Sequence, residues 1–133
     1  QDLEECIKID KKYGYQEIIK IKAQKDIDDL MRSALSFHDA HIESIEAKND
    51  EIHVVFDSYC NRKIELWFKQ KPKYENRLEE PEYHWWDGGS IFMNQGYIYL
   101  CDEINAHSLD EGYWGMYFAG KELFYRILPS DNN

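Results

Sequence analysis

The stretch that decides the fold is residues 26–57, which read DIDDLMRSALSFHDAHIESIEAKNDEIHVVFD. Its first apolar residues are spaced i, i+3, i+4, i+7 and i+8, which places them on one face of an α-helix. They are Ile27, Leu30, Met31, Ala34 and Leu35. We expect Asp26 to cap the N-terminus of this helix, and Asp28 and Asp29 to favour the positive end of its dipole.

After this helix the apolar period changes to two, which is the period of a half-buried strand. Ile42 and Ile45 indicate a first short strand, and their spacing, off by one, predicts a bulge. Asn49 and Asp50 supply a turn. The alternating apolar residues of the next two strands are Ile52, Val54 and Phe56, then Ile64, Leu66 and Phe68. These three strands predict a β-meander.

The rest of the chain gives weaker patterns. Residues 1–24 are ambiguous, because Ile7 and Ile9 alternate as in a strand while the later isoleucines fit either period. Residues 70–90 predict a long polar loop. Strands are expected at 91–93 and 97–101, and a hairpin of 113–119 with 122–128 is expected across Gly120 and Lys121. The tail 129–133 is expected to fray.

These patterns predict an α+β fold in one domain, residues 1–133. Its main part is an antiparallel β-sheet of about six or seven strands in meanders, with one or two N-terminal helices packed on it. The 15% aromatic content of the 133 residues supports a folded chain.

The cysteines and the apolar runs bear on location. Cys6, Cys60 and Cys101 are odd in number, far apart and without a CxxC pair, which favours free thiols in a reducing cytosol. No apolar run approaches the roughly 20 residues of a membrane helix. The chain begins at Gln1 without a Met, which leaves open the removal of an upstream segment. We therefore predict a cytoplasmic protein with no membrane partner.

The charge is uneven along the chain. Residues 1–74 hold 15 acids and 13 bases, a net of −2, whereas residues 75–133 hold 11 acids and 3 bases, a net of −8, and the two sum to the overall −10. A surface of this sign repels phosphate backbones and attracts a basic protein. We expect no nucleic-acid partner, and solubility alone is the simpler explanation of the acidity.

The first candidate site is the sequence Phe37-His38-Asp39-Ala40-His41. Two imidazoles and a carboxylate are ligands that divalent metals take, and they also form acid–base pairs. Further ligands would come from the second half of the chain: Asp102, Glu103, His107 or Glu111. The alternative is structural, with Asp39 turning the chain and His38 filling a polar niche at the helix end. We favour the structural role, and predict no metal or other cofactor.

The second candidate site is Tyr83-His84-Trp85-Trp86-Asp87-Gly88-Gly89. Adjacent tryptophans in a loop form a stacking platform for sugars or an anchor at a protein interface. The alternative places one Trp in the core and the other at its rim.

Residues 35–45, LSFHDAHIESI, resemble a short motif that precedes a β-meander in small bacterial domains of unknown function. Those domains carry Phe or Leu, then His-Asp, then Ala or Ser, and some are assigned on genomic context as immunity proteins of polymorphic toxin systems. The resemblance implies a non-enzymatic domain in which His38 and Asp39 shape the fold or a shared groove. It carries over no catalytic residue.

Together these observations favour a small acidic interaction domain, of the immunity type that the resemblance implies, with a basic protein as partner. Its binding residues are predicted to be His38, Asp39, His41, Trp85, Trp86, Asp87, Asp102, Glu103 and Glu111. The alternatives are a metal-dependent enzyme that uses His38, Asp39 and His41, and a carbohydrate-binding module that uses the two tryptophans. The oligomeric state stays open.

Overall fold

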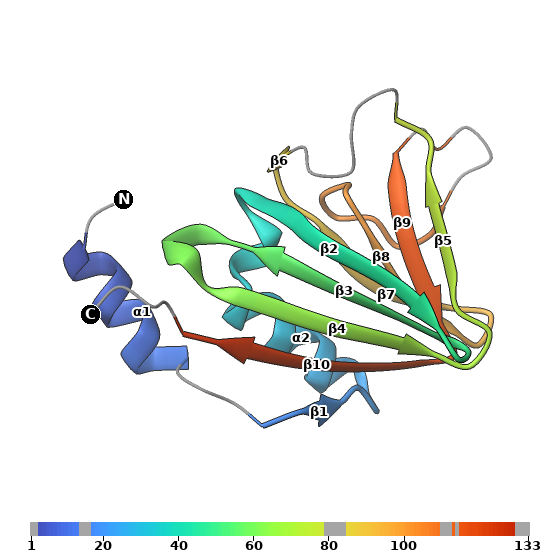
Figure 1. The fold of residues 1–133 in the computed structure, drawn as a ribbon, viewed down its shortest axis with the longest axis horizontal. Coiled ribbons are helices and arrows are strands. Elements are labelled where there is room, and N and C mark those ends of the chain that lie inside the picture. The colour runs from blue at the N-terminus through green and yellow to red at the C-terminus, as the bar shows by residue number, and fades with distance from the viewer. Residues whose placement is uncertain (1–2, 14–16, 79–84, 110–112, 114, 130–133) are drawn as a thin grey trace.

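The computed structural model describes residues 3–13, 17–78, 85–109, 113 and 115–129 (Figure 1). The helical elements there are α1 (Leu3–Tyr13), α2 (Gln24–Ser33) and two short 3-10 turns, η1 (Leu35–Phe37) and η2 (Tyr59–Asn61). The strands are β1 (Ile19–Lys20), β2 (Ala40–Lys48), β3 (Glu51–Asp57), β4 (Lys63–Lys69), β5 (Lys73–Asn76), β6 (Trp85–Trp86), β7 (Ser90–Asn94), β8 (Tyr97–Cys101), β9 (Met116–Gly120) and β10 (Glu122–Leu128).

The strands form two antiparallel sheets, of six strands in the order β1-β10-β4-β3-β2-β6 and of four in the order β5-β9-β8-β7. This confirms the α+β fold with N-terminal helices on antiparallel sheet. The β2–β3–β4 meander and the bulge between Ile42 and Ser44 are also confirmed. The strands that the sequence missed are the short ones, β1, β5 and β6.

The core lies between the six-stranded sheet and a second layer, made of α2 and the four-stranded sheet (Figure 1). Side chains that alternate along β3 and β4 point into this core, as the period of two predicts. The Phe118 ring from β9 stacks on the Phe68 ring, with 5.7 Å between the ring centroids. It also packs edge-on against the Phe56 ring, with 6.4 Å between the centroids, so the two sheets are in direct aromatic contact.

The start of α2 differs from the prediction. The helix begins at Gln24, so Asp26 lies inside the first turn and is not the N-terminal cap. Its carboxylate accepts hydrogen bonds from the backbone N–H groups of Lys22 (2.8 Å) and Ala23 (3.1 Å). Asp26 therefore fixes the chain that enters the helix, a role that a carboxylate in the first turn fills as well as a cap does.

Two predictions for the second half are wrong. Residues 70–90 are not one loop, because β5 and β6 lie within them. Residues 113–119 and 122–128 do not form a hairpin, because β9 pairs with β5 and β8 while β10 pairs with β4 and β1. The chain changes sheets at Gly120, where an added Cβ would lie 3.0 Å from the backbone of Lys69. Gly120 is thus required by close backbone approach, and not by a hairpin turn.

The ambiguous segment 1–24 forms α1 and the short strand β1. α1 lies beyond one end of the six-stranded sheet (Figure 1), and it carries the exposed apolar residues Leu3 and Ile7 outward. The strand-like spacing of Ile7 and Ile9 was misleading because α1 buries little apolar surface. In the tail, residues 130–133, which were expected to fray, lie outside the described residues.

Candidate functional site

The structure brings the two predicted motifs together. Beyond the β2–β6 pairing, the N–H of Asp39 donates to the Trp86 carbonyl (3.1 Å), and the N–H of Gly89 donates to the Ser36 carbonyl (2.9 Å). His38 extends from this junction, with its Nδ1 3.2 Å from the Asp87 carbonyl oxygen. The segments 36–39 and 86–89, which the sequence gives as separate candidates, therefore lie side by side.

The chain at this junction has an unusual backbone. Leu35, Ser36 and Phe37 have φ angles of 53°, 54° and 58°, and Asp39 has 56°. Residues other than glycine adopt this left-handed backbone conformation at a conformational cost of order 1–3 kcal/mol each, and such residues are frequent at functional sites. This turn points the His38 ring outward while Phe37 stays in the core.

His41 is separated from His38 by the strand geometry. It lies in β2 opposite Asp57 of β3 and Trp85 of β6. Its ring centroid is 4.2 Å from that of Trp85, and its Nε2 is 3.9 Å from an Asp57 carboxylate oxygen. His38, in contrast, approaches the Asp39 carboxylate, at 3.3 Å from its Nε2. Each imidazole thus has a different carboxylate as neighbour.

Trp85 and Trp86 point to opposite faces of the sheet, because neighbours in a strand alternate. Trp85 is 61% exposed, whereas Trp86 is 1% exposed and packs its ring against Phe37 and Phe56. The prediction that both tryptophans bind a ligand is therefore corrected for Trp86, which is a core residue. A sugar platform would have Trp85 alone.

Asp102 and Glu103 directly follow β8, whose last residue, Cys101, lies beside Gly89 of this junction. The Asp102 carboxylate accepts hydrogen bonds from the Tyr113 hydroxyl and from the Met116 N–H (3.2 Å), and it ties the end of β8 to the start of β9. Burial, with Asp102 as neighbour, raises the pKa of Tyr113 above its usual range. Glu103 has an exposed side chain and uses its carbonyl to accept from Ser90. Glu111 lies outside the described residues.

The described residues do not assemble the predicted metal ligands. Within that part of the chain, no group of three or more His, Cys, Asp or Glu side chains converges as a metal site. Sequence spacing allowed His38 and His41 to share a metal, but β2 begins at Ala40 and separates them.

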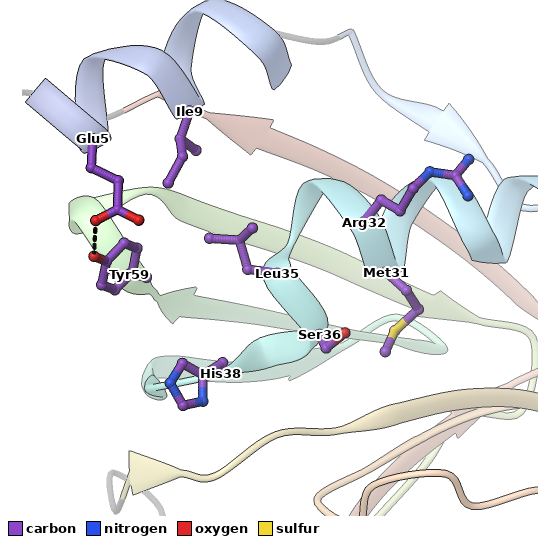
Figure 2. Close-up of a pocket in the computed structure, with 8 residues that line it drawn as sticks. All are labelled: Glu5, Ile9, Met31, Arg32, Leu35, Ser36, His38 and Tyr59. Atoms are coloured by element: carbon purple, nitrogen blue, oxygen red, sulfur yellow. Dashed lines mark hydrogen bonds between the residues drawn. The ribbon is translucent and has the colours of Figure 1, made fainter.

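A hollow of about 630 Å³ lies next to His38 (Figure 2). Its lining comes from α1, from the end of α2, and from both 3-10 turns. The lining residues are Glu5, Ile9, Met31, Arg32, Leu35, Ser36, His38 and Tyr59. The Tyr59 hydroxyl donates to the Glu5 carboxylate at 2.9 Å, which joins α1 to η2 across one end of the hollow.

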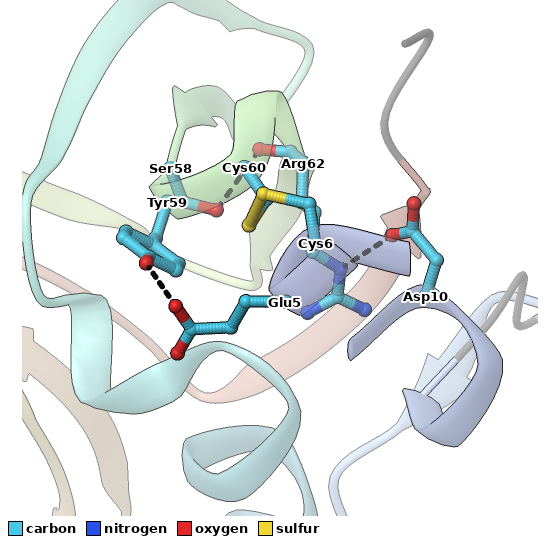
Figure 3. The surroundings of a disulfide bond; sticks show 7 residues. All are labelled: Glu5, Cys6, Asp10, Ser58, Tyr59, Cys60 and Arg62. Carbon is cyan, nitrogen blue, oxygen red and sulfur yellow. Dashed lines mark hydrogen bonds and ion pairs between the residues drawn. A yellow bond between two sulfur atoms is a disulfide. The ribbon is translucent and has the colours of Figure 1, made fainter. Parts of the chain in front are cut away.

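A disulfide between Cys6 and Cys60 holds α1 beside this hollow (Figure 3). The prediction of three free thiols is therefore wrong for these two, and Cys101 alone is a free, buried cysteine among the described residues. Burial raises the pKa of the Cys101 thiol. Arg62 lies under α1, 1% exposed, with its Nε 3.5 Å from the Asp10 carboxylate.

Sequence reasoning missed Glu5, Ile9 and Tyr59 because the disulfide, and not a local pattern, brings them to the hollow. The available signal was the cysteines, but three cysteines at long separations leave their pairing open.

Comparison of the chain with protein families, with curated proteins and with solved structures found no match. Neither helix in the described ranges is long and apolar enough to cross a membrane.

Proposed function

We propose that this chain is a non-enzymatic protein-interaction domain that binds a basic protein partner through the edge of its six-stranded sheet. The proposed surface, called the Trp85 edge, consists of Trp85, His41, Asp39, Asp57 and Asp87. Residues 35–45 resemble small bacterial domains of unknown function, and because some of those are assigned as immunity proteins of polymorphic toxin systems, a toxin domain is the favoured partner.

The exposure of Trp85 is the observation that carries this proposal. A large aromatic ring that is 61% exposed leaves much apolar area in water, and tryptophan is the residue most enriched at the energetic centres of protein interfaces. The contact with the His41 ring, at 4.2 Å, limits the rotation of Trp85 in the free protein. A side chain that is already ordered loses less entropy when a partner covers it.

Charge favours a basic partner. Asp39 and Asp87 are exposed on either side of the β2–β6 junction, and Asp57 lies one strand further in. Lys63 offsets part of this charge, since its Nζ is 3.4 Å from Asp57. The chain as a whole keeps a net charge of −10, which accelerates encounter with a basic protein and repels nucleic acid.

A photo-crosslinking residue at position 85 tests the proposal. Trp85 would be replaced by p-benzoylphenylalanine, and the protein irradiated in lysate of its native host at low and high salt. The matched control carries the same residue at Lys48, an exposed position at the other end of β2. We expect position 85, but not position 48, to crosslink to a basic protein. The yield of this adduct should fall as the salt concentration rises, because salt screens the surface charges that bring the two proteins together. No adduct from position 85, or equal adducts from both positions, would contradict the proposal.

A further inference from the structure

The hollow beside His38 has an apolar centre. Ile9 of α1 and Leu35 of η1 point toward one another, and Ser36, His38 and Met31 of α2 complete the lining next to them (Figure 2). Its volume of about 630 Å³ lies within the range of about 300–1,000 Å³ that is typical of small-molecule sites. Met31 and Leu35 are only partly buried, so the floor of the hollow is accessible from outside.

This hollow adjoins the Trp85 edge. His38 belongs to the lining of the hollow, and its ring also contacts the Asp87 carbonyl (3.2 Å) and the Asp39 carboxylate (3.3 Å). His38 therefore lies between the hollow and the Trp85 edge, so that a partner surface over Trp85 lies next to the hollow.

Carboxylates lie in and beside the hollow. Glu5 is exposed on one side, and Asp39 and Asp87 are exposed on the side of the Trp85 edge. The cation in the lining, Arg32, is in an ion pair with Asp29. Figure 2 shows the Arg32 guanidinium directed away from Leu35 and His38. An apolar surface with Glu5 on one side and Asp39 and Asp87 on the other is complementary to an apolar side chain flanked by lysine or arginine.

We propose that the hollow receives an apolar side chain of the basic partner, one that lies between basic residues of that partner. This inference rests on the proposed function and adds a second, apolar contact to it. The contact makes binding about tenfold tighter, ~1.4 kcal/mol, than binding by charge and Trp85 alone.

The disulfide makes this contact depend on redox state. Glu5 and Ile9 belong to α1, and the Cys6–Cys60 bond is the covalent link between α1 and η2 on the opposite wall. Without the bond, α1 keeps the weaker polar contacts of Glu5 with Tyr59 and of Asp10 with Arg62. Reduction by a dithiol, which supplies two electrons and two protons and is itself oxidised to a disulfide, converts Cys6 and Cys60 to two thiols, and thereby opens one wall of the hollow and leaves the Trp85 edge in place.

Two synthetic peptides test the inference. Both alternate lysine with glycine and are amidated, and their central residue is leucine in one and serine in the other. The readout is NMR of ¹³C-methyl methionine, because Met31 lines the hollow while the buried Met116 reports on folding. We expect the leucine peptide to shift the Met31 signal and to bind about tenfold tighter than the serine peptide.

Two variants locate the effect. Leu35→Asn removes apolar lining, and asparagine adopts the positive φ of this position readily, so the fold is retained. The pair Cys6→Ala and Cys60→Ala removes the tether. In both variants we expect the leucine peptide to fall to the affinity of the serine peptide, which itself stays unchanged.

The outcomes separate the inference from the proposed function. Equal binding of the two peptides to the unmodified protein would overturn the apolar contact and leave the Trp85 edge intact. Failure of both peptides to bind would overturn both. A preference for leucine that survives in Leu35→Asn would place the apolar contact elsewhere and overturn the inference.

Discussion

The β2–β3–β4 meander and the α1 corner, which is α1 with Cys60 and Arg62, are held in opposite ways. The meander is formed by neighbouring strands whose alternating side chains enter the core, so each strand is fixed by the next in sequence. The α1 corner is fixed by residues more than fifty positions away, through the Cys6–Cys60 bond and the Asp10–Arg62 pair. We infer that the meander determines whether the chain folds, and that the α1 corner determines whether the hollow exists.

The largest effect is expected in the meander. The Phe56 ring contacts Phe37 at 5.2 Å and Trp86 at 4.9 Å, and it is fully buried. Phe56→Ala should lower the free energy of unfolding by about 4–5 kcal/mol, since the packed rings cannot close the cavity. Urea unfolding measures this. The matched control is Val55→Ala, on the opposite face of β3, which should cost about 1 kcal/mol; similar losses for both would show that the meander does not depend on its inner face.

Removal of the disulfide should come next. The bond joins residues 54 apart, and Cys6→Ala with Cys60→Ala should cost about 4 kcal/mol through the added freedom of the unfolded chain. Hydrogen exchange should show faster exchange in α1 than in β3, because α1 has few other contacts. A reducing agent should lower the stability of the unmodified protein in the same way and leave the double variant unchanged. Equal acceleration in α1 and β3 would mean that the two regions open as one unit.

The same contrast explains what the sequence predicts and what it hides. Alternation in residues 52–56 and 64–68 is a local signal, so the strands and their pairing were predicted correctly. The passage of the chain from one sheet to the other at Gly120 was not predicted, because a glycine between two strands usually indicates a turn. Here the glycine is needed because the Lys69 backbone lies too close for a Cβ atom. Short strands such as β6 carry too few residues to show a period.

The candidate site was predicted in part for the same reason. His38, Asp39 and Trp85 stand in conspicuous short motifs, and the structure brings these motifs together. The hollow was not predictable, because Ile9 belongs to a helix that a covalent bond to Cys60 holds in place. Burial of Trp86 follows from strand alternation, but only once β6 is recognised as a strand.

A smaller effect should isolate the polar part of the α1 corner. Arg62 is buried under α1 and faces the Asp10 carboxylate, which is 22% exposed. Asp10→Asn keeps the size of the side chain and removes its charge, and it should lower the free energy of unfolding by about 1 kcal/mol, because it removes a Coulomb attraction that the partial exposure of Asp10 already screens. Lys8→Gln, at an exposed position of α1, should change nothing measurable in the same unfolding experiment. A cost for Asp10→Asn as large as that of losing the disulfide would show that the ion pair, and not the bond, holds α1.

The smallest effect tests a polar contact that is local, as in the meander, but exposed. In β5, Glu75 is two residues from Arg77, whose Nε and Nη2 donate to the carboxylate at 2.8 and 3.0 Å. Arg77, and to a lesser extent the Tyr117 hydroxyl, hold the pKa of Glu75 below its ordinary value. The stabilisation is therefore complete above the unfolded pKa and is lost as the pH falls through the lower pKa of the folded protein.

Carboxyl NMR titration should show the pKa of Glu75 rising in Arg77→Gln and unchanged in Lys73→Gln, since the Lys73 ammonium lies over the Tyr97 ring at 4.2 Å. If the pKa of Glu75 stays low in Arg77→Gln, the Tyr117 hydroxyl and not Arg77 is the cause of the lowered pKa. Because the pairing of β5 with β9 brings Tyr117 to Glu75, even this contact would then depend on residues that are distant in the sequence.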